Sequence, residues 1–369
     1  MDYQIGRNSV KHGNGSSGQF GSWERRIELD IQSSYVGSAL SDVPVLIDES
    51  ILPSDIWSIA QNGGGDLRVC TDSQGITRIA LEVVTFNTAT QKCELWINVP
   101  SISSTVDTPL FMFYGKAGVS QPAAAAAFGK YAVWPSGDYL SVYHYEGSGV
   151  DSTVHQRNPQ SENNMSYSAG KIGQAADFNG TSSVIDHQAD FTLNSDDIQY
   201  QAWLKPNNTA TGAEYIWGPD GAGNPQLNNF LNFEIQSGGN TKLFMPNNNP
   251  QGQASTWALS NGVWQWVTEI YEAIGGGAPF CDHRLNYSTL DNDGWAPTTN
   301  NVNVTNAATA VGAWYDTVTS TFKGFYDGSI DEFRIIDREW SNDRLSFEYE
   351  NQNNVSNVLN YIFPLIPNI

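Results

Sequence analysis

Residues 324–336 contain the run Gly328-Ser329-Ile330-Asp331-Glu332-Phe333-Arg334-Ile335. Three large apolar side chains in it, those of Ile330, Phe333 and Ile335, can fill a core, while Arg334 can reach a carboxylate. Branched and aromatic side chains of this kind favour pleated strands. The run therefore predicts a core strand of a β domain.

Short strand-like runs also precede this one, each bounded by turn residues. They lie at 140–145, 183–186, 200–204, 230–235, 242–245, 264–271, 280–285 and 308–312. Asn179-Gly180 is a tight turn, and Ser341 is placed to cap a helix that reaches about Glu350. Such spacing over more than half of the chain suits a large two-sheet sandwich of jelly-roll type.

The N-terminal half shows a second, separate set of strand signals. Ile27, Leu29 and Ile31 alternate with acidic residues, the pattern of a half-buried strand. Further runs lie at 43–47, 67–69, 79–86, 93–99 and 110–114, with room for a short helix at 54–60. This density of strands is typical of one antiparallel sandwich.

Composition shifts divide the chain into four parts. Residues 1–22 are rich in Gly, Asn and Ser and predict a flexible N-terminal arm. We expect a β-sandwich domain at 23–120, an Ala-rich linker at 121–130, and the jelly-roll domain at 131–369. The expected fold class is all-β, with two β-sandwich domains.

The first domain resembles a β domain of unknown function that often precedes lectin-like domains in bacterial, archaeal and viral proteins. The resemblance names no activity. It covers about residues 21–120 and rests on five ordered motifs: Gly21-Ser22-Trp23-Glu24-Arg25-Arg26, Leu40-Ser41-Asp42-Val43-Pro44-Val45-Leu46, Gly65-Asp66-Leu67-Arg68, Leu95-Trp96-Ile97-Asn98-Val99-Pro100-Ser101 and Phe113-Tyr114-Gly115-Lys116.

The second domain resembles the concanavalin A-like, laminin-G-like jelly roll over about residues 131–362. The motifs are Val142-Tyr143-His144-Tyr145, residues 170–180, Ala202-Trp203-Leu204-Lys205-Pro206 and the run at 328–335. Such domains imply binding of glycans or proteins, and a few relatives are glycosidases. By this resemblance calcium is the expected cofactor, and its candidate ligands are Asp177, Asn179 and Asp331.

The charge balance narrows the choice of partners. The 369 residues include 39 Asp and Glu against 18 Lys and Arg, a formal net charge of -21. A field of that sign repels phosphate backbones and anionic lipids, so we expect neither nucleic acid nor membrane as a partner. The start of the chain shows no signal peptide. The three cysteines give no disulfide framework, and Cys70 and Cys93 are expected to be buried thiols.

The sequence lacks the paired glutamates of a glycosidase at the expected strand positions. Retaining enzymes need two carboxyl groups about 5 Å apart. In laminarinase-type relatives these lie on one strand as Glu-x-Asp-x-x-Glu, whereas here Ser329 and Arg334 stand at the two Glu positions. Asp331 and Glu332, as neighbours on a strand, are expected to point to opposite faces. We therefore expect no enzyme, with these two residues pairing with Arg334 or Arg338.

Two loops are candidates for ligand binding. Asp291, Asp293 and Trp295 share one turn, where carboxylates suit a cation and an aromatic face suits a sugar ring. Trp314 and Tyr315 form the second candidate. A plain Asx-rich turn and an edge-packed aromatic pair are the structural alternatives.

These features together predict a function on the surface of a particle. Both resemblances are to domains that work outside cells, yet the chain carries no export signal. A bacteriophage virion protein, made in the host cytoplasm and released by lysis, reconciles the two. We expect a capsid decoration protein or a tail-associated adhesion module that binds other virion proteins through its arm and first domain, binds a glycan through the jelly roll, and is compatible with a homo-oligomer.

Two alternatives stay open. One is a cellular carbohydrate-binding protein, secreted and extracellular, whose signal peptide is missing from this sequence. The other is a degenerate glycoside hydrolase.

Overall fold

The computed structural model describes residue 20 and residues 22–187, 191–195, 197–209, 212–219, 231–245, 249–272, 280–294, 302–307, 309–316 and 319–367. Strands dominate it, which confirms the predicted all-β class. The helices are α1 (Ile56–Ile59), α2 (Asn342–Asn353) and α3 (Val355–Val358), with 3-10 turns η1 (Ser33–Tyr35), η2 (Glu49–Ile51) and η3 (Lys130–Ala132). No helix in the described ranges is long and apolar enough to cross a membrane.

The first domain is a sandwich of two small antiparallel sheets. One sheet has the order β26 (Leu359–Pro367), β1 (Arg25–Ile31), β6 (Thr108–Tyr114), β3 (Arg68–Cys70). The other has the order β2 (Leu40–Asp48), β5 (Lys92–Ile102), β4 (Leu81–Asn87). Ile27, Leu29 and Ile31 are buried on one face of β1, as their alternation predicts. Cys70 and Cys93 are buried free thiols, also as expected.

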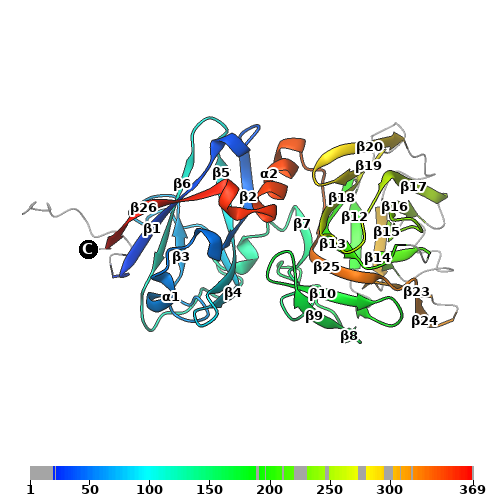
Figure 1. Ribbon diagram of the computed structural model, residues 1–369, viewed down its shortest axis with the longest axis horizontal. Coiled ribbons are helices and arrows are strands. Elements are labelled where there is room, and N and C mark those ends of the chain that lie inside the picture. Colours follow the sequence, from blue (N-terminus) through cyan, green and yellow to red (C-terminus); the bar gives the residue numbers. More distant parts are fainter. Residues whose placement is uncertain are drawn as a thin grey trace, which may run out of the picture.

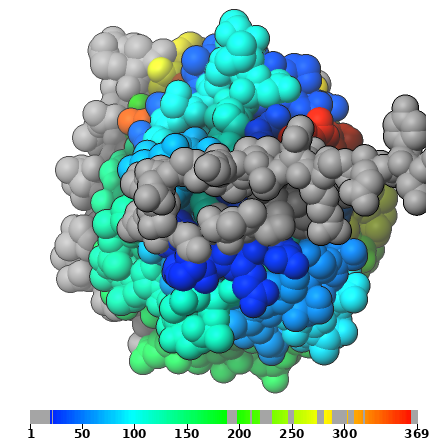
Figure 2. All heavy atoms as spheres, turned by 90° about the vertical axis from the view of Figure 1, so that its left-hand side faces the viewer, coloured from blue at the N-terminus to red at the C-terminus, as the bar shows by residue number. Residues whose placement is uncertain are grey.

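The C-terminal strand belongs to this first sheet. β26 pairs antiparallel with β1, from Arg25 opposite Pro367 to Ile31 opposite Leu359. Viewed from the first-domain end, a red C-terminal segment accordingly lies among the blue and cyan residues (Figure 2). Here the structure differs from the expected division, which placed all of 131–369 in the second domain. The first domain is discontinuous, and the second is inserted between two of its strands.

The second domain is a sandwich of two larger antiparallel sheets (Figure 1). The eight-stranded sheet contains β20 (Ser288–Gly294), β19 (Phe280–Leu285), β18 (Gln265–Glu272), β13 (Asp197–Pro206), β25 (Asp327–Ile336), β10 (Gln174–Asn179), β9 (Ser166–Ala169) and, also on β25, β7 (Tyr139–Tyr143). The seven-stranded sheet contains β17 (Asn249–Ala258), β16 (Asn240–Met245), β15 (Asn232–Ile235), β14 (Glu214–Pro219), β22 (Thr309–Val311), β11 (Val184–Asp186) and β8 (Ser161–Asn163).

Two short ribbons complete the second domain. They are β12 (Phe191–Ser195) with β21 (Val302–Ala307), and β23 (Trp314–Asp316) with β24 (Thr321–Lys323). The core between the two large sheets includes Ile330, Phe333 and Ile335, the three side chains predicted to fill it. This arrangement confirms the predicted two-sheet sandwich.

The outer face of the eight-stranded sheet is covered by the first domain and α2. Figure 1 shows α2 between the two sandwiches. Ser341 caps this helix by accepting from the backbone N–H of Arg344, as predicted. From the sheet, Trp203 donates its indole N–H to Gln352 of α2 at 3.1 Å. On the other side, Asn351 bonds both backbone groups of Leu46 on β2, at 2.7 and 3.1 Å.

Candidate functional site

The interdomain site begins at an irregularity in β25. β10 pairs with the first half of this strand and β7 with its second half, so the ladder on that side is interrupted at Asp331 and Glu332. Glu332 has φ 50°, and the register with β13 shifts at the same place. This geometry is a β-bulge, in which an extra residue changes the direction of the side chains that follow.

The bulge brings both acidic side chains near Glu94 of the first domain, whose pKa burial and both of these charges raise. Asp331 accepts the backbone N–H groups of Lys171 and Ile172, each at 2.8 Å, and Glu332 contacts His144 at 2.6 Å. The expectation that Asp331 and Glu332 point to opposite faces is therefore wrong, because strict alternation fails at a bulge. Burial and the neighbouring charge of Glu332 raise the pKa of Asp331 well above its usual value.

His144, just after β7, lies among three carboxylates from both domains. Its Nδ1 is 2.6 Å from Glu332 and 3.2 Å from Glu94 of β5, and its Nε2 is 3.4 Å from Glu82 of β4. Burial alone lowers the pKa of an imidazole. Here Glu332 and Glu82 overcome that effect and raise the pKa of His144 well above 6.5. The carboxylates therefore favour the protonated form of this imidazole.

Arg334 completes a group that we call the seam cluster, defined as Glu82, Glu94, His144, Glu332 and Arg334. Two tryptophans pack beside it. Arg334 donates to Glu332 at 2.8 Å and lies 4.5 and 5.0 Å from the ring centroids of Trp96 and Trp134. The indole N–H of Trp96 donates to Glu94 at 3.0 Å, and that of Trp134 to Glu82 at 2.6 Å. Each of the three carboxylates thus has at least one hydrogen-bond or ion-pair partner at the buried domain interface.

Three members of the cluster have the spacing of metal ligands. Glu94, His144 and Glu332 offer atoms within 4.8 Å of one another, the one such group of His, Cys, Asp or Glu in the described ranges. One imidazole and two carboxylates are a donor set that zinc accepts. However, Nδ1 of His144 is hydrogen-bonded to Glu332 and lies 3.2 Å from Glu94, so the imidazole nitrogen is already engaged without a metal.

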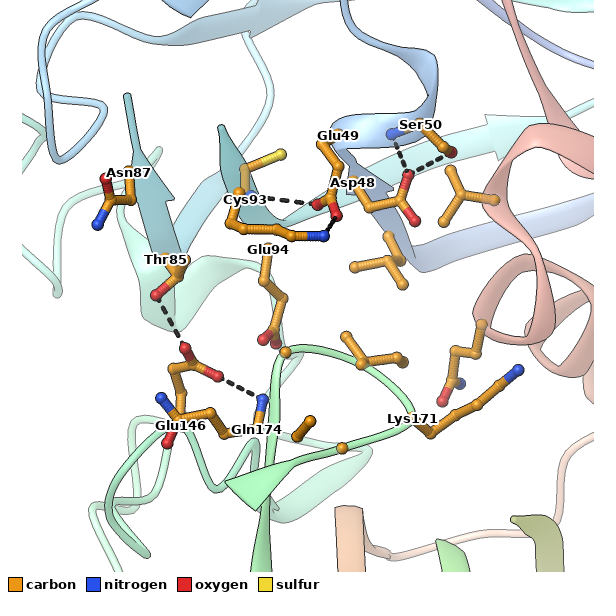
Figure 3. A pocket seen from close by; sticks show the side chains of 18 of the residues that line it. Asp48, Glu49, Ser50, Thr85, Asn87, Cys93, Glu94, Glu146, Lys171 and Gln174 are labelled. Carbon is orange, nitrogen blue, oxygen red and sulfur yellow. Dashed lines mark hydrogen bonds and ion pairs between the residues drawn. The ribbon is translucent and has the colours of Figure 1, made fainter. Parts of the chain in front are cut away.

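A cleft of about 820 Å³ opens between the domains beside the cluster. Figure 3 shows the side chains of Glu94 and Glu146 next to each other beside the loop before β10. Glu146 accepts from Thr85 at 3.2 Å and from the backbone N–H of Gln174 at 2.7 Å. The lining comes from both domains and from the α2–α3 turn, with Asp48, Glu49, Glu94 and Glu146 as its acids and Lys92 and Lys171 as its bases.

The cleft is polar and partly pre-organised. Lys92 pairs with Glu49, and Lys171 donates to Asn353 at 2.8 Å while lying 4.8 Å from the ring centroid of Trp203. Among the described residues that line the cleft, none is aromatic. The arrangement can therefore offer hydrogen bonds and charge to a ligand, but no ring on which it could stack.

The three residues expected to bind calcium each serve a different neighbour. Asp177 accepts from the hydroxyl of Ser329 at 2.6 Å. Asn179 accepts the backbone N–H groups of residues 181–183, the pattern of an Asx turn. Asp331 holds the loop before β10. In the structure these side chains form hydrogen bonds that stabilise a strand pair, a turn and a loop.

Of the two predicted ligand-binding loops, the structure describes the side chains of only one. Trp295 lies outside the described residues, as do the side chains of Asp291 and Asp293, whose backbones are part of β20. Trp314 and Tyr315 are half-buried on the β23–β24 ribbon. Trp314 packs on Tyr215 with ring centroids 5.9 Å apart, and Tyr315 packs on Phe322 at 5.0 Å. This is the edge-packed arrangement that was the structural alternative.

No protein-family model and no curated protein matches the chain. Solved structures of lectin-like β-sandwich domains are similar to part of it. Domain 4 of AbnA, a GH43 extracellular arabinanase from Geobacillus stearothermophilus in complex with arabinotriose, is 21% identical, with a TM-score of 0.42 over 56% of this chain and 96% of its own.

Two further structures are similar at the same low level. A heptameric SAP-like pentraxin from Limulus polyphemus is 17% identical, with a TM-score of 0.37 over 46% of this chain and 78% of its own. The ligand-binding domain of botulinum neurotoxin serotype D, in complex with N-acetylneuraminic acid, is 13% identical, with a TM-score of 0.41 over 58% of this chain and 51% of its own. This chain thus spans about half of that domain.

Proposed function

We propose that this protein is a non-catalytic carbohydrate-binding protein whose interdomain cleft holds the glycan. The observation that supports this is the cleft itself, which both domains line with carboxylates, amides, hydroxyls and lysines. Sugar hydroxyls both donate and accept hydrogen bonds, so they match a mixed set of this kind. A pocket of several hundred Å³ has the size of small-molecule sites.

The charge of the cleft favours neutral or amino sugars. Four acidic side chains line it against two basic ones, so a uronate or a sialic acid meets net repulsion. We expect neutral oligosaccharides to bind and their carboxylated counterparts to bind at least tenfold more weakly. A glycan array with matched neutral and acidic sugars, followed by calorimetry on the best ligand, measures this.

Two cleft variants test the location. Gln174→Ala and Lys171→Ala each remove a side chain at the cleft wall. Each is expected to weaken the calorimetrically measured affinity about tenfold, since each removes one polar contact. Gln160→Ala, at an exposed position outside the cleft lining, serves as the matched control. Unchanged affinity in both cleft variants, or no glycan bound on a broad array, contradicts the proposal.

We further propose that the protein works on the surface of a bacteriophage particle, as a capsid decoration protein or a tail-associated adhesion module. The support comes from the sequence: a net charge of -21 and a Gly-, Asn- and Ser-rich N-terminal segment. Such a charge keeps crowded copies soluble. Mass spectrometry of purified particles tests this proposal, and absence of the protein from them ends it.

One observation favours glycoside hydrolysis as a second candidate. Ligand atoms of Glu94 and Glu332 lie within 4.8 Å of each other. Burial and Glu332 raise the pKa of Glu94, whereas His144 and Arg334 outweigh burial and lower that of Glu332 to about 2. A retaining glycosidase needs such a divided pair.

Access argues against this second candidate. Glu94 and Glu332 are each 1% exposed, and of the two only Glu94 borders the cleft. Release of reducing sugar from a panel of neutral β-glucans, abolished in both Glu94→Gln and Glu332→Gln, would establish hydrolysis and overturn the non-catalytic proposal.

A further inference from the structure

Two carboxylates converge on one glycine at the edge of the cleft. Gly173 has φ 50°, in the left-handed region that favours glycine. A Cβ atom at this position would be 2.5 Å from Oε2 of Glu146 and 2.7 Å from Oε2 of Glu94. The two oxygens, one from each domain's side of the cleft, thus approach the same point. A Cβ atom at this residue would collide with both oxygens, so only glycine fits beside them.

The Glu94 oxygen at this point has no hydrogen-bond donor. Oε1 of Glu94 is bonded to Trp96, whereas Oε2 is buried without a partner among the described residues. Glu94 is 1% exposed and lines the cleft. A buried carboxylate oxygen without a partner is unfavourable, because the loss of its hydration is not offset. This oxygen therefore points to a ligand that supplies positive charge.

We propose that a calcium ion binds between Glu94 and Glu146 beside Gly173, with its remaining coordination positions open to the cleft. Calcium takes 6–8 oxygen ligands at about 2.3–2.6 Å and tolerates irregular geometry. Two carboxylates supply at most four of these ligands. Water fills the others in the free protein, and adjacent hydroxyls of a sugar replace the water in the complex, a step that rests on the proposed function.

The site differs in place and chemistry from the group of Glu94, His144 and Glu332. That group uses Oε1 of Glu94 and an imidazole nitrogen, and its members contact one another directly. The proposed site uses Oε2 of Glu94 and Oε2 of Glu146 on the cleft side, and the latter oxygen also accepts the backbone N–H of Gln174. Oxygen-only donors select a hard cation.

Terbium luminescence tests cation binding without any glycan. Tb³⁺ replaces Ca²⁺ at oxygen sites, and Trp96, hydrogen-bonded to Glu94, is placed to transfer excitation energy to it. The chelator-treated full chain is excited at the tryptophan band and titrated with Tb³⁺ and then with Ca²⁺. We expect sensitised emission that saturates at one ion per chain and that Ca²⁺ displaces.

Three variants locate the ion. Glu146→Gln keeps the shape of a half-buried side chain and removes its charge, so we expect at least tenfold weaker binding. Gly173→Ala places a methyl group against both oxygens, with the same expected loss. Glu49→Gln is the matched control, because Glu49 lines the same cleft but is paired with Lys92. Circular dichroism confirms that each variant is folded.

The outcomes separate this inference from the proposed function. Absence of sensitised emission in the wild type, or binding unchanged in both Glu146→Gln and Gly173→Ala, overturns the calcium site. Glycan binding that persists with EDTA at full affinity overturns the bridging role and leaves the carbohydrate function standing. If calcium binds but no glycan on the array does, the calcium site is supported and the carbohydrate-binding function is contradicted.

Discussion

Two buried histidines, His144 at the domain interface and His187 inside the second sandwich, lie in surroundings of different charge. His187 is 5% exposed and lies between Tyr143 and Trp217, with ring centroids 4.9 and 5.9 Å away. Its Nδ1–H donates to the carbonyl of Arg157 at 3.0 Å. Burial lowers the pKa of His187 to about 4, against which this bond is a minor effect.

His144 is equally buried, yet Glu332 and Glu82 reverse the effect of burial and raise its pKa. The difference shows that neighbouring carboxylates, and not burial alone, set the direction of the pKa shift of a buried histidine in this protein. Breaking a buried pair costs more than losing an aromatic contact, because the remaining partner is left as an unpaired charge. The predictions below test whether the two regions differ in this way.

The largest effect is expected from His144→Ala. The change leaves Glu82, Glu94 and Glu332 with one cation fewer, and we expect the free energy of unfolding to fall by about 3–5 kcal/mol. Urea unfolding followed by tryptophan fluorescence measures it. His155→Ala, at an exposed position, is the control. A loss under about 1 kcal/mol would mean that the carboxylates do not depend on the imidazole.

A second variant asks whether the interface also depends on neutral hydrogen bonds. Asn351→Ala removes the amide that bonds both backbone groups of Leu46, and leaves those buried groups unsatisfied. We expect a loss of about 2–3 kcal/mol in the same urea experiment. Asn353→Ala, on the exposed side of the same helix, should lose much less. Equal losses would show that α2 is held by its apolar contacts alone.

The interior histidine predicts a pH dependence. The unfolded chain binds a proton at His187 below about pH 6.5, whereas the folded chain keeps it neutral down to about pH 4. The unfolded state therefore binds more protons in this window, and stability falls as pH falls. Between pH 7 and pH 5 the wild type should lose about 2 kcal/mol more than His187→Phe, as measured by urea unfolding. Parallel losses in the two proteins would contradict the neutral, buried imidazole.

The smallest effect is expected at the N-terminus of α2. Ser341→Ala removes the side-chain cap of α2, and we expect a loss of about 1 kcal/mol. Ser168→Ala, an exposed strand position, should change stability by less than half of that. Thermal unfolding of the two variants side by side measures the difference.

Local patterns predicted the strands well, because alternation is a local property. The half-buried β1 was evident in Ile27, Leu29 and Ile31, and the start of α2 in Ser341. β26 was missed, since Pro364 and Pro367 interrupt its apolar residues. Proline is tolerated at the edge of a sheet, and β26 is such an edge strand. An apolar run with prolines near the end of the chain was the available signal.

The interdomain site could not be predicted in the same way. His144 and Glu332 are 188 residues apart in the sequence, and no local period relates them. The bulge at Glu332 reversed an inference that rested on strict alternation. One signal was present: Glu82 and Glu94 each interrupt an apolar strand run, and a charge in such a position is buried only with a partner. The sequence could not show which residue that partner is.

The pairing of β26 with β1 also has a consequence for the order of synthesis. The sheet that begins at residue 25 gains its edge strand only after residue 367 has left the ribosome. By then the entire inserted sandwich has emerged and can already be folded, and its compact shape brings the two flanking segments near each other. A folded insert holds the segments before and after it close together, whereas a disordered chain of the same length would bring them together slowly. We therefore expect the insert to speed the pairing of β26 with β1.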